Sequence, residues 1–310
     1  MSHSPLDEKR GPYFAGWYLK HQTGSGNALA LIPAMHIDAA GRRGASLQVI
    51  AGGQAWWIEY PDSEFHAGEK LLQIQLGQNI FSREGIQLGI EQAGLSLQGA
   101  LRYGPFTVLK SDIMGPFRFF PGMECCHGIL SMGHTLKGAL SLNGERLDFS
   151  GGRGYIETDR GRSFPRSYLW TQCLWSGGSL MLSIADIPLP VGHFTGCICA
   201  VIHQGREYRL ASYRGLRIRH WSPEGAEISQ GKYRLAVQLL AEQGCLLRAP
   251  KLGSMERTVR ESLRAKVRYC FWNGETLLFS HTDDNASFEY ADSRESDTGE
   301  ALPVCFSLRP

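Results

Sequence analysis

The chain has 310 residues, and its 32 Lys and Arg against 30 Asp and Glu leave a formal net charge of only +2. This balance is too small to attract a phosphate backbone or an acidic membrane by its field alone, so we expect no nucleic-acid partner. The length exceeds the roughly 250–300 residues at which a single core stops growing, which predicts two packed units or one large β structure.

The N-terminal residues MSHSPLDEKRGPY are polar where a secretory signal would be apolar. The most apolar region, residues 179–202, is interrupted by charged residues and prolines, so it is not a clean span of about 20 residues. We therefore expect a cytoplasmic protein without a transmembrane segment. We also expect the eight Cys to be reduced, because a chain of this length without a secretion signal rarely depends on a disulfide framework.

Alternating apolar residues and 37 Gly predict many short strands joined by tight turns. The pattern is clearest from Leu71 to Tyr103, where we expect a meander with one wet face. Asn143-Gly144 lies between two apolar runs, as does Asn273-Gly274, and this dipeptide favours the tight turn of a hairpin. No strand is followed by a crossover helix, so the expected class is all-β, with antiparallel barrels or sandwiches.

The densest cluster of polar and aromatic residues runs from Gly151 to Trp175. If residues 154–159 are extended, Tyr155, Glu157 and Asp159 share one face. Ser163-Phe164-Pro165 predicts a turn, and the strand after it places Tyr168, Trp170 and Gln172 on one face and Trp175 on the other. We therefore expect Trp170, and not Trp175, to line a pocket.

One segment, Ser254 to Arg264, predicts a helix. Ser254 is a suitable N-cap, and Met255, Val259 and Leu263 recur at a spacing of four. Its basic residues alternate with Glu256 and Glu261, so we interpret this run as a solvated face without function.

Several blocks together resemble the tocopherol cyclase family. They are FAGWYLK at residues 14–20, MGPFRFFPGMECCHGILSMGH at 114–134, GGRGYIETDRGRSFPRSYLWTQC at 151–173 and SIADIPLPVGHFTGCICAV at 183–201. The resemblance extends from Phe14 to about Glu289. Three positions depart from the family pattern: Ala15, Arg160 and Leu174 stand where Glu, Trp and Asn are usual.

The resemblance implies two lipocalin-like β-barrels, related to hydroxyneurosporene synthase, around a cavity for a prenylated aromatic molecule. We expect the N-terminal barrel at residues 1–145 and the C-terminal barrel at 146–310. The implied activity is an intramolecular cyclase (an isomerase) that closes a ring on a quinol-like substrate, without a cofactor or a metal.

Such a ring closure requires an acid that protonates an alkene, a group that stabilises the tertiary cation, and a group that orients the phenol. Glu157 or Asp159 is the expected acid, if an apolar site keeps it protonated. Tyr168 and Trp170 are expected to face the cation. The remaining expected substrate-binding residues are Tyr155 and Gln172, which could orient the phenol, His127 and His134, which could relay its proton, and Arg162.

Other interpretations remain open. Glu157 and Asp159 could instead pair with Arg153, Arg160 or Arg162. A metal site built on Glu124, Cys125, Cys126, His127 and His134 is disfavoured, because adjacent Cys chelate poorly and no metal-binding motif is present. The protein could also be a non-catalytic carrier, or a hydratase or cyclase of another terpenoid or polyketide.

Overall fold

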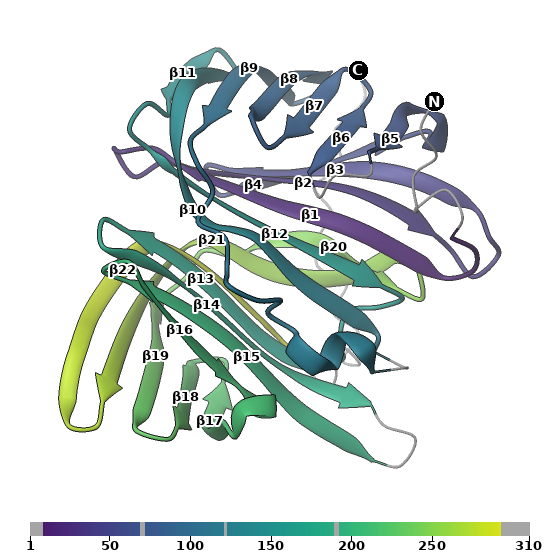
Figure 1. Cartoon of the computed structure of the whole chain (residues 1–310). Coiled ribbons are helices and arrows are strands. Elements are labelled where there is room, and N and C mark those ends of the chain that lie inside the picture. Colours follow the sequence, from purple (N-terminus) through teal and green to yellow (C-terminus); the bar gives the residue numbers. More distant parts are fainter. Residues whose placement is uncertain (1–8, 69–71, 121–122, 189–191, 293–310) are drawn as a thin grey trace.

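The computed structural model describes residues 9–68, 72–120, 123–188 and 192–292, which form two antiparallel sheets with only short 3-10 helices (Figure 1). The all-β class is therefore confirmed. The 3-10 helices are η1 (Asp62–Glu64), η2 (Gly115–Phe119) and η3 (Ser212–Arg214). No helix in the described ranges is long and apolar enough to span a membrane.

The first sheet has the strand order β4-β3-β2-β1-β12-β10-β9-β8-β7-β6-β5, with β11 on β10. Its strands are β1 (Tyr13–Gln22), β2 (Ala28–Ile37), β3 (Arg43–Ala51), β4 (Gln54–Tyr60), β5 (Phe65–Ala67), β6 (Gln73–Leu76), β7 (Asn79–Ser82), β8 (Gly85–Gln92), β9 (Leu95–Tyr103), β10 (Cys125–Leu142), β11 (Glu145–Asp148) and β12 (Arg153–Gly161).

The second sheet has the order β16-β15-β14-β13-β22-β21-β19-β18-β17, with β20 on β21. Its strands are β13 (Tyr168–Trp175), β14 (Gly178–Pro188), β15 (His193–His203), β16 (Arg206–Ala211), β17 (Arg217–Ser222), β18 (Gly225–Gln230), β19 (Tyr233–Ala241), β20 (Cys245–Lys251), β21 (Ser254–Asn273) and β22 (Thr276–Ala291).

Each sheet curls around its own hydrophobic core, but its hydrogen-bonded order stays open in the described residues, so the sheets are not closed barrels. The change of sheet falls between β12 and β13. The expected division after residue 145 lies before β12, yet β12 pairs with β1 and β10 of the first sheet. The Ser163-Phe164-Pro165 turn, rather than the earlier hairpin, therefore carries the chain into the second sheet.

A third apolar cluster lies between the two sheets and joins them. Strands β1, β10 and β12 face β13 and β14 across it (Figure 1). Strands β1, β12 and β13 bury most of both faces, one in their own sheet's core and one in the cluster between the sheets. The strand β13 is accordingly buried along almost its whole length.

The expected helix at Ser254–Arg264 is wrong, because these residues form the first half of strand β21. Met255, Val259 and Leu263 are four residues apart, and a spacing of four is also a multiple of the strand period of two. Val259, Glu261 and Leu263 are buried, whereas Arg260 and Arg264 are exposed. Alternation of burial therefore shows that the odd-numbered positions face inward.

The expected meander is confirmed as strands β6 to β9, although its first residue, Leu71, lies outside the described residues. Both predicted hairpins form, between β10 and β11 and between β21 and β22. The first hairpin turn has Asn143 and Gly144 at positive φ, as its sequence predicts. The described cysteines are free thiols.

The hairpin that joins β20 and β21 rests against the first sheet through Gly253. The Gly253 amide donates to the carbonyl of Arg162 at 2.7 Å. A Cβ atom on Gly253 would lie 1.8 Å from the carbonyl oxygen of Ile37, and its φ of +78° favours glycine. Backbone therefore meets backbone at this end of the interface between the sheets.

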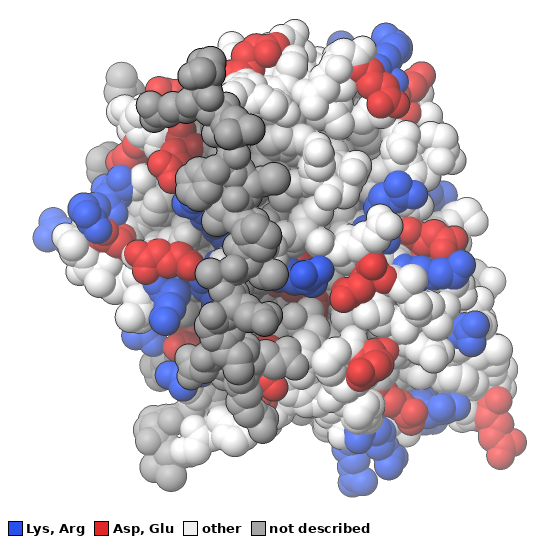
Figure 2. Space-filling model, turned by 180° about the vertical axis from the view of Figure 1, so that it is seen from behind, with Lys and Arg blue, Asp and Glu red and all other residues white. Residues whose placement is uncertain are grey.

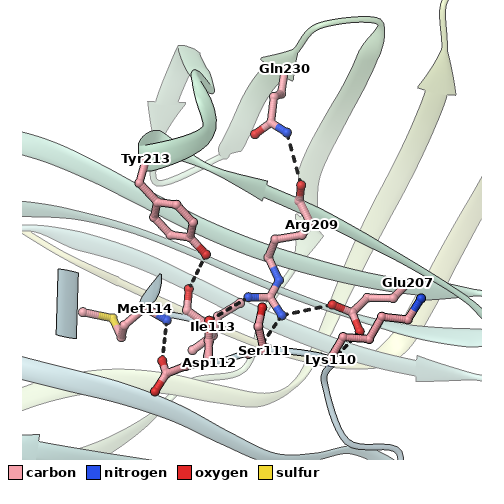
Figure 3. A network of polar contacts seen from close by, with 9 residues as sticks. All are labelled: Lys110, Ser111, Asp112, Ile113, Met114, Glu207, Arg209, Tyr213 and Gln230. Carbon is pink, nitrogen blue, oxygen red and sulfur yellow. Dashed lines mark hydrogen bonds and ion pairs between the residues drawn. The ribbon is translucent and has the colours of Figure 1, made fainter. Parts of the chain in front are cut away.

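A second contact between the two parts of the chain is centred on Arg209 of β16 (Figure 3). Its guanidinium donates to the carbonyls of Ser111 and Asp112 at 3.0 Å each, and to the Glu207 carboxylate at 3.1 Å. Tyr213 donates to the carbonyl of Ile113 at 3.0 Å. These bonds fix the segment between β9 and β10 to the outer strands of the second sheet.

The surface carries no single-sign patch on the face shown in Figure 2, where Lys and Arg are interspersed with Asp and Glu. This mixture agrees with the small net charge of +2.

Candidate functional site

The main cavity lies between the two sheets and is lined by both of them. It comprises about 1350 Å³ of space, part of which is open to solvent. Its wall is mostly apolar. The apolar lining residues include Phe14, Ile32, Ala34, Met114, Phe117, Met123, Phe164, Ala185, Ile187, Ile198, Leu247, Ala249, Met255 and Val259.

The first-sheet wall of the cavity is organised around Glu157 of β12, which is only 4% exposed. Its Oε2 atom accepts hydrogen bonds from the hydroxyl of Tyr155 at 2.5 Å and from the indole N–H of Trp170 at 3.2 Å. Burial raises the pKa of Glu157, whereas the adjacent His127 and the Tyr155 hydrogen bond oppose that rise. An oxygen that accepts from several donors is best satisfied as a carboxylate.

His127 lies between two carboxylates on this wall. Its Nδ1 is 3.0 Å from Oδ1 of Asp159, and its Nε2 is 3.3 Å from Oε2 of Glu157. Burial alone would lower the pKa of His127, but the charges of Glu157 and Asp159 raise it well above the usual value. The imidazole is therefore protonated at neutral pH, and the three side chains form an ionised group.

The second-sheet wall carries two further buried carboxyls, Glu289 of β22 and Glu261 of β21. Glu289 accepts a short hydrogen bond from the hydroxyl of Tyr168, and Glu261 accepts one from the hydroxyl of Tyr18 at 2.6 Å. The two glutamates are direct partners in the register of β21 and β22. Burial raises the pKa of Glu261 to about 7 and that of Glu289 to about 8.

Two aromatic side chains cross the cavity in opposite directions. Tyr18 comes from the first sheet and donates to Glu261 of the second, whereas Trp170 comes from the second sheet and donates to Glu157 of the first. Their rings meet edge to face, with centroids 5.2 Å apart. They bring the carboxyls of both walls close to one apolar space.

His127, Glu157 and Asp159 also offer ligand atoms within 4.8 Å of one another, as a metal ion would need. A metal would require the neutral form of His127, because a protonated imidazole has no free lone pair. The two carboxylates favour the protonated form instead. The set therefore fits an internal ion pair better than a metal site.

The structure brings together Glu157, Asp159, His127, Tyr168 and Trp170, which all line the cavity. The shared face of Tyr155, Glu157 and Asp159 has the predicted geometry, with Tyr155 fully buried behind Glu157. Trp175 packs against the core of the second sheet, on the other face from Trp170, as expected. The alternative ion pairs with Arg153, Arg160 or Arg162 do not form among the described residues, and Glu157 and Asp159 pair with His127.

Four expected substrate-binding residues do not line the cavity: Tyr155, which lies behind Glu157, and His134, Arg162 and Gln172. His134 packs against Tyr103 with ring centroids 4.5 Å apart, and burial lowers its pKa to about 3. Arg162 is exposed in the turn after β12. Gln172 is fully buried, and neither polar atom of its side chain has a protein partner.

Sequence reasoning missed Glu261, Glu289 and Tyr18. Glu261 was hidden by the helical interpretation of its segment, in which it belonged to a solvated face. A strand interpretation would have placed it between Val259 and Leu263, on an apolar face where a charged residue is unusual. Tyr18 lies in β1 and Glu289 in β22. Only the way in which these distant strands are arranged shows that both residues line one cavity.

No protein-family model matches the chain. A stretch of 161 residues is 27% identical to a probable chloroplastic tocopherol cyclase of rice, Oryza sativa subsp. japonica, and covers 48% of this chain. The chain spans only about a third of that relative, since the match covers 34% of its length. The similarity to a tocopherol cyclase therefore holds over about half of the chain.

Among solved structures, the fold is similar to that of kievitone hydratase from Nectria haematococca. The TM-score is 0.53 at 9% sequence identity, and the alignment covers 92% of this chain and 90% of that one. The likeness shows that almost the whole chain shares the architecture of that hydratase.

Proposed function

We propose that this protein is an enzyme that protonates a carbon–carbon double bond of an apolar substrate and adds an oxygen nucleophile to the resulting cation. The observation that carries the proposal is the cavity between the sheets, where an ionised group faces buried carboxyls across an apolar space. An enzyme of this kind needs both an acid and a base in one site of low polarity.

The aromatic rings of the cavity support the cationic step. The faces of Trp170 and Tyr168 can stabilise a tertiary carbocation, and each such contact is worth about 0.5–2 kcal/mol. The apolar lining offers few hydrogen-bond partners to water, which would otherwise capture the cation. The ionised group of Glu157, His127 and Asp159 then accepts the proton that leaves the attacking hydroxyl.

The nucleophile decides between two reactions of one class. If the substrate's own phenol attacks, the product is a ring and the enzyme is an intramolecular cyclase of the tocopherol cyclase type, which the rice relative supports. If water attacks, the enzyme is a hydratase, and the fold of kievitone hydratase keeps that alternative open. We favour the cyclase and a prenylated, quinol-like aromatic as its substrate, and we propose that the chain belongs to the tocopherol cyclase family.

The test is to incubate the purified protein with prenylated benzoquinols in deuterium oxide and to separate the products before mass spectrometry. Cyclisation gives a chromanol with one non-exchangeable deuterium on carbon. A hydratase would also place a deuterium on carbon, but its product would in addition carry an oxygen atom from ¹⁸O-labelled water. Recovery of unchanged, unlabelled ligand would show a carrier and would contradict the proposal.

Variants then connect the reaction to the site. We expect Glu157→Gln and Asp159→Asn to reduce turnover at least 100-fold, because each removes part of the group that accepts the proton. Glu145→Gln is the matched control, since Glu145 is exposed on β11. Equal turnover in all three variants would contradict the role of this wall.

A further inference from the structure

The cavity contains more carboxyls than the ionised group uses. Glu261 and Glu289 line the second-sheet wall, are 3% and 7% exposed, and have no ion pair within 4.0 Å among the described residues. Burying two such groups without a cation is costly unless they keep a proton. Two buried carboxyls without an ion pair therefore require another source of stabilisation.

The register of the second sheet places them side by side. Glu261 is the direct partner of Glu289 on the neighbouring strand, and Trp170 is the direct partner of Glu289 on the other side. Directly opposite residues of an antiparallel pair have Cβ atoms about 4.5–5.5 Å apart, and two like charges there repel one another. One proton shared by the two carboxyls removes this repulsion.

Other charged and titratable groups around the pair do not supply a direct counterion. Glu289 faces Tyr168 and Arg257 as well as Asp159, and Glu261 faces Tyr18 and Lys20 as well as Glu157. The charge of Arg257 opposes the rise in the pKa of Glu289, and that of Lys20 opposes the rise in the pKa of Glu261. Neither cation donates a hydrogen bond to these carboxyls, because their hydrogen bonds are made to other acceptors. Arg257 donates to the carbonyls of Pro165 and Arg166, and Lys20 donates to the carbonyl of Asn285 and the hydroxyl of Ser287.

We infer that Glu261 and Glu289 form a carboxyl pair that holds one proton and donates it to the substrate, opposite the anionic group of Glu157, His127 and Asp159. This assignment rests on the proposed function and moves the acid from the first-sheet wall to the second. The high pKa values caused by burial agree with a neutral carboxyl at pH 7.

The proton balance is simple. The neutral carboxyl transfers its proton to one alkene carbon, so that it becomes a carboxylate and the neighbouring carbon becomes a cation. The attacking oxygen forms the C–O bond, and its proton passes to the Glu157 carboxylate. Glu157 releases that proton to water, and the pair takes one back from water, so the reaction consumes no net proton.

Two measurements test the inference, and the first needs no substrate. In protein labelled with ¹³C at the glutamate carboxyls, NMR should show a carboxyl that is still protonated at pH 7 and that titrates near pH 7–8. In Glu261→Gln or Glu289→Gln, the remaining member should titrate at a lower pH than the upper step of the pair, because its charged neighbour is gone. Glu256→Gln, an exposed control on the same strand, should change nothing.

The second measurement is turnover in deuterium oxide as a function of pH. We expect turnover of the wild type to fall as pH rises through the upper titration step, and Glu289→Gln to lower kcat at least 100-fold with a small change in KM. Glu289→Asp, which keeps an acid, should retain more activity. Circular dichroism should show that each variant folds.

The outcomes separate the inference from the proposed function. An active wild type with equally active Glu261→Gln and Glu289→Gln variants overturns the donor role alone. A wild type without turnover on any substrate overturns the proposed function and the donor role together. The absence of any protonated carboxyl at pH 7 overturns the shared proton.

Discussion

The two walls of the cavity use the same kinds of side chain but give their carboxyls different partners. On the first wall, Glu157 and Asp159 share the imidazolium of His127, so the negative charges are compensated. On the second wall, Glu261 and Glu289 each have a tyrosine hydroxyl and one another. Glu157 is as deeply buried as Glu261 and Glu289, so the partner decides which of these carboxyls keeps its proton.

The largest expected effect comes from removing the cation of the first wall. His127→Gln leaves the buried Glu157 beside the partly exposed Asp159 without a positive charge, and we expect it to lower the free energy of unfolding by about 3–5 kcal/mol at pH 7. The loss should be smaller at pH 5, because burial raises the pKa of Glu157 and favours its uptake of a proton there. Urea unfolding at both pH values measures it, and an equal loss at both would contradict the ion pair.

The next effect concerns how the segment between β9 and β10 is held, because this segment places Met114 and Phe117 in the cavity wall. Arg209→Met removes the donors to the carbonyls of Ser111 and Asp112, and we expect a loss of about 2–3 kcal/mol. Arg219→Met is the control, because its hydrogen bond to Ser229 is exposed. Chemical denaturation compares the two, and equal stability of both variants would show that the Arg209 contacts contribute nothing measurable.

A smaller effect should separate the walls by pH. The pKa values of Glu261 and Glu289 are raised above the usual 4.5 by burial, so their contribution to stability is complete below about pH 4.5 and is lost as pH rises through about 7 and 8. The double variant Glu261→Gln/Glu289→Gln should therefore be more stable than the wild type at pH 9, on the order of 2 kcal/mol. It should lose this advantage at pH 5.

Thermal or urea unfolding from pH 5 to pH 9 measures that difference. The matched control is Glu256→Gln/Glu275→Gln, which removes the same charge from exposed positions. A difference between wild type and double variant that does not change with pH would contradict the raised pKa values.

The smallest effect should distinguish the two tyrosine–glutamate contacts. Tyr168→Phe removes a hydrogen bond that lowers the pKa of Glu289, so that pKa should rise by about half a unit to one unit. The alkaline limb of the pH–rate profile should move up with it. Tyr155→Phe removes the corresponding bond on Glu157 and should leave that limb in place, so a shift in both variants would contradict the assignment of the donor.

The sequence predicted much of the fold, because alternation along each strand is a local property. It gave the all-β class, the meander, both hairpins, and the correct faces of Tyr155 and Trp170. It failed at residues 254–264, where a spacing of four satisfies helix and strand alike. The long strand β21 becomes evident only when its pairing with β19, β20 and β22 is known.

The sequence predicted the first wall of the site but not the second, for a related reason. The residues of the first wall are close in sequence to a recognisable motif, so Glu157, Asp159 and His127 could be proposed from it. The second wall is made by β13, β21 and β22. β13 is distant in sequence from the other two strands, and the register of the β21–β22 hairpin alone places Glu261 opposite Glu289. Two glutamates that become neighbours only through strand register have no shared signal in the sequence.

The backbone contact at Gly253 affects how closely the two sheets approach each other. Since this residue lets the β20–β21 hairpin touch the backbone of the first sheet, the spacing of the two sheets, and with it the width of the cavity, depends on this contact as well as on the lining residues. A change in this turn, which lies outside the cavity, could thus alter the size of the proposed substrate. The carboxyls and aromatic rings of the cavity walls would stay the same.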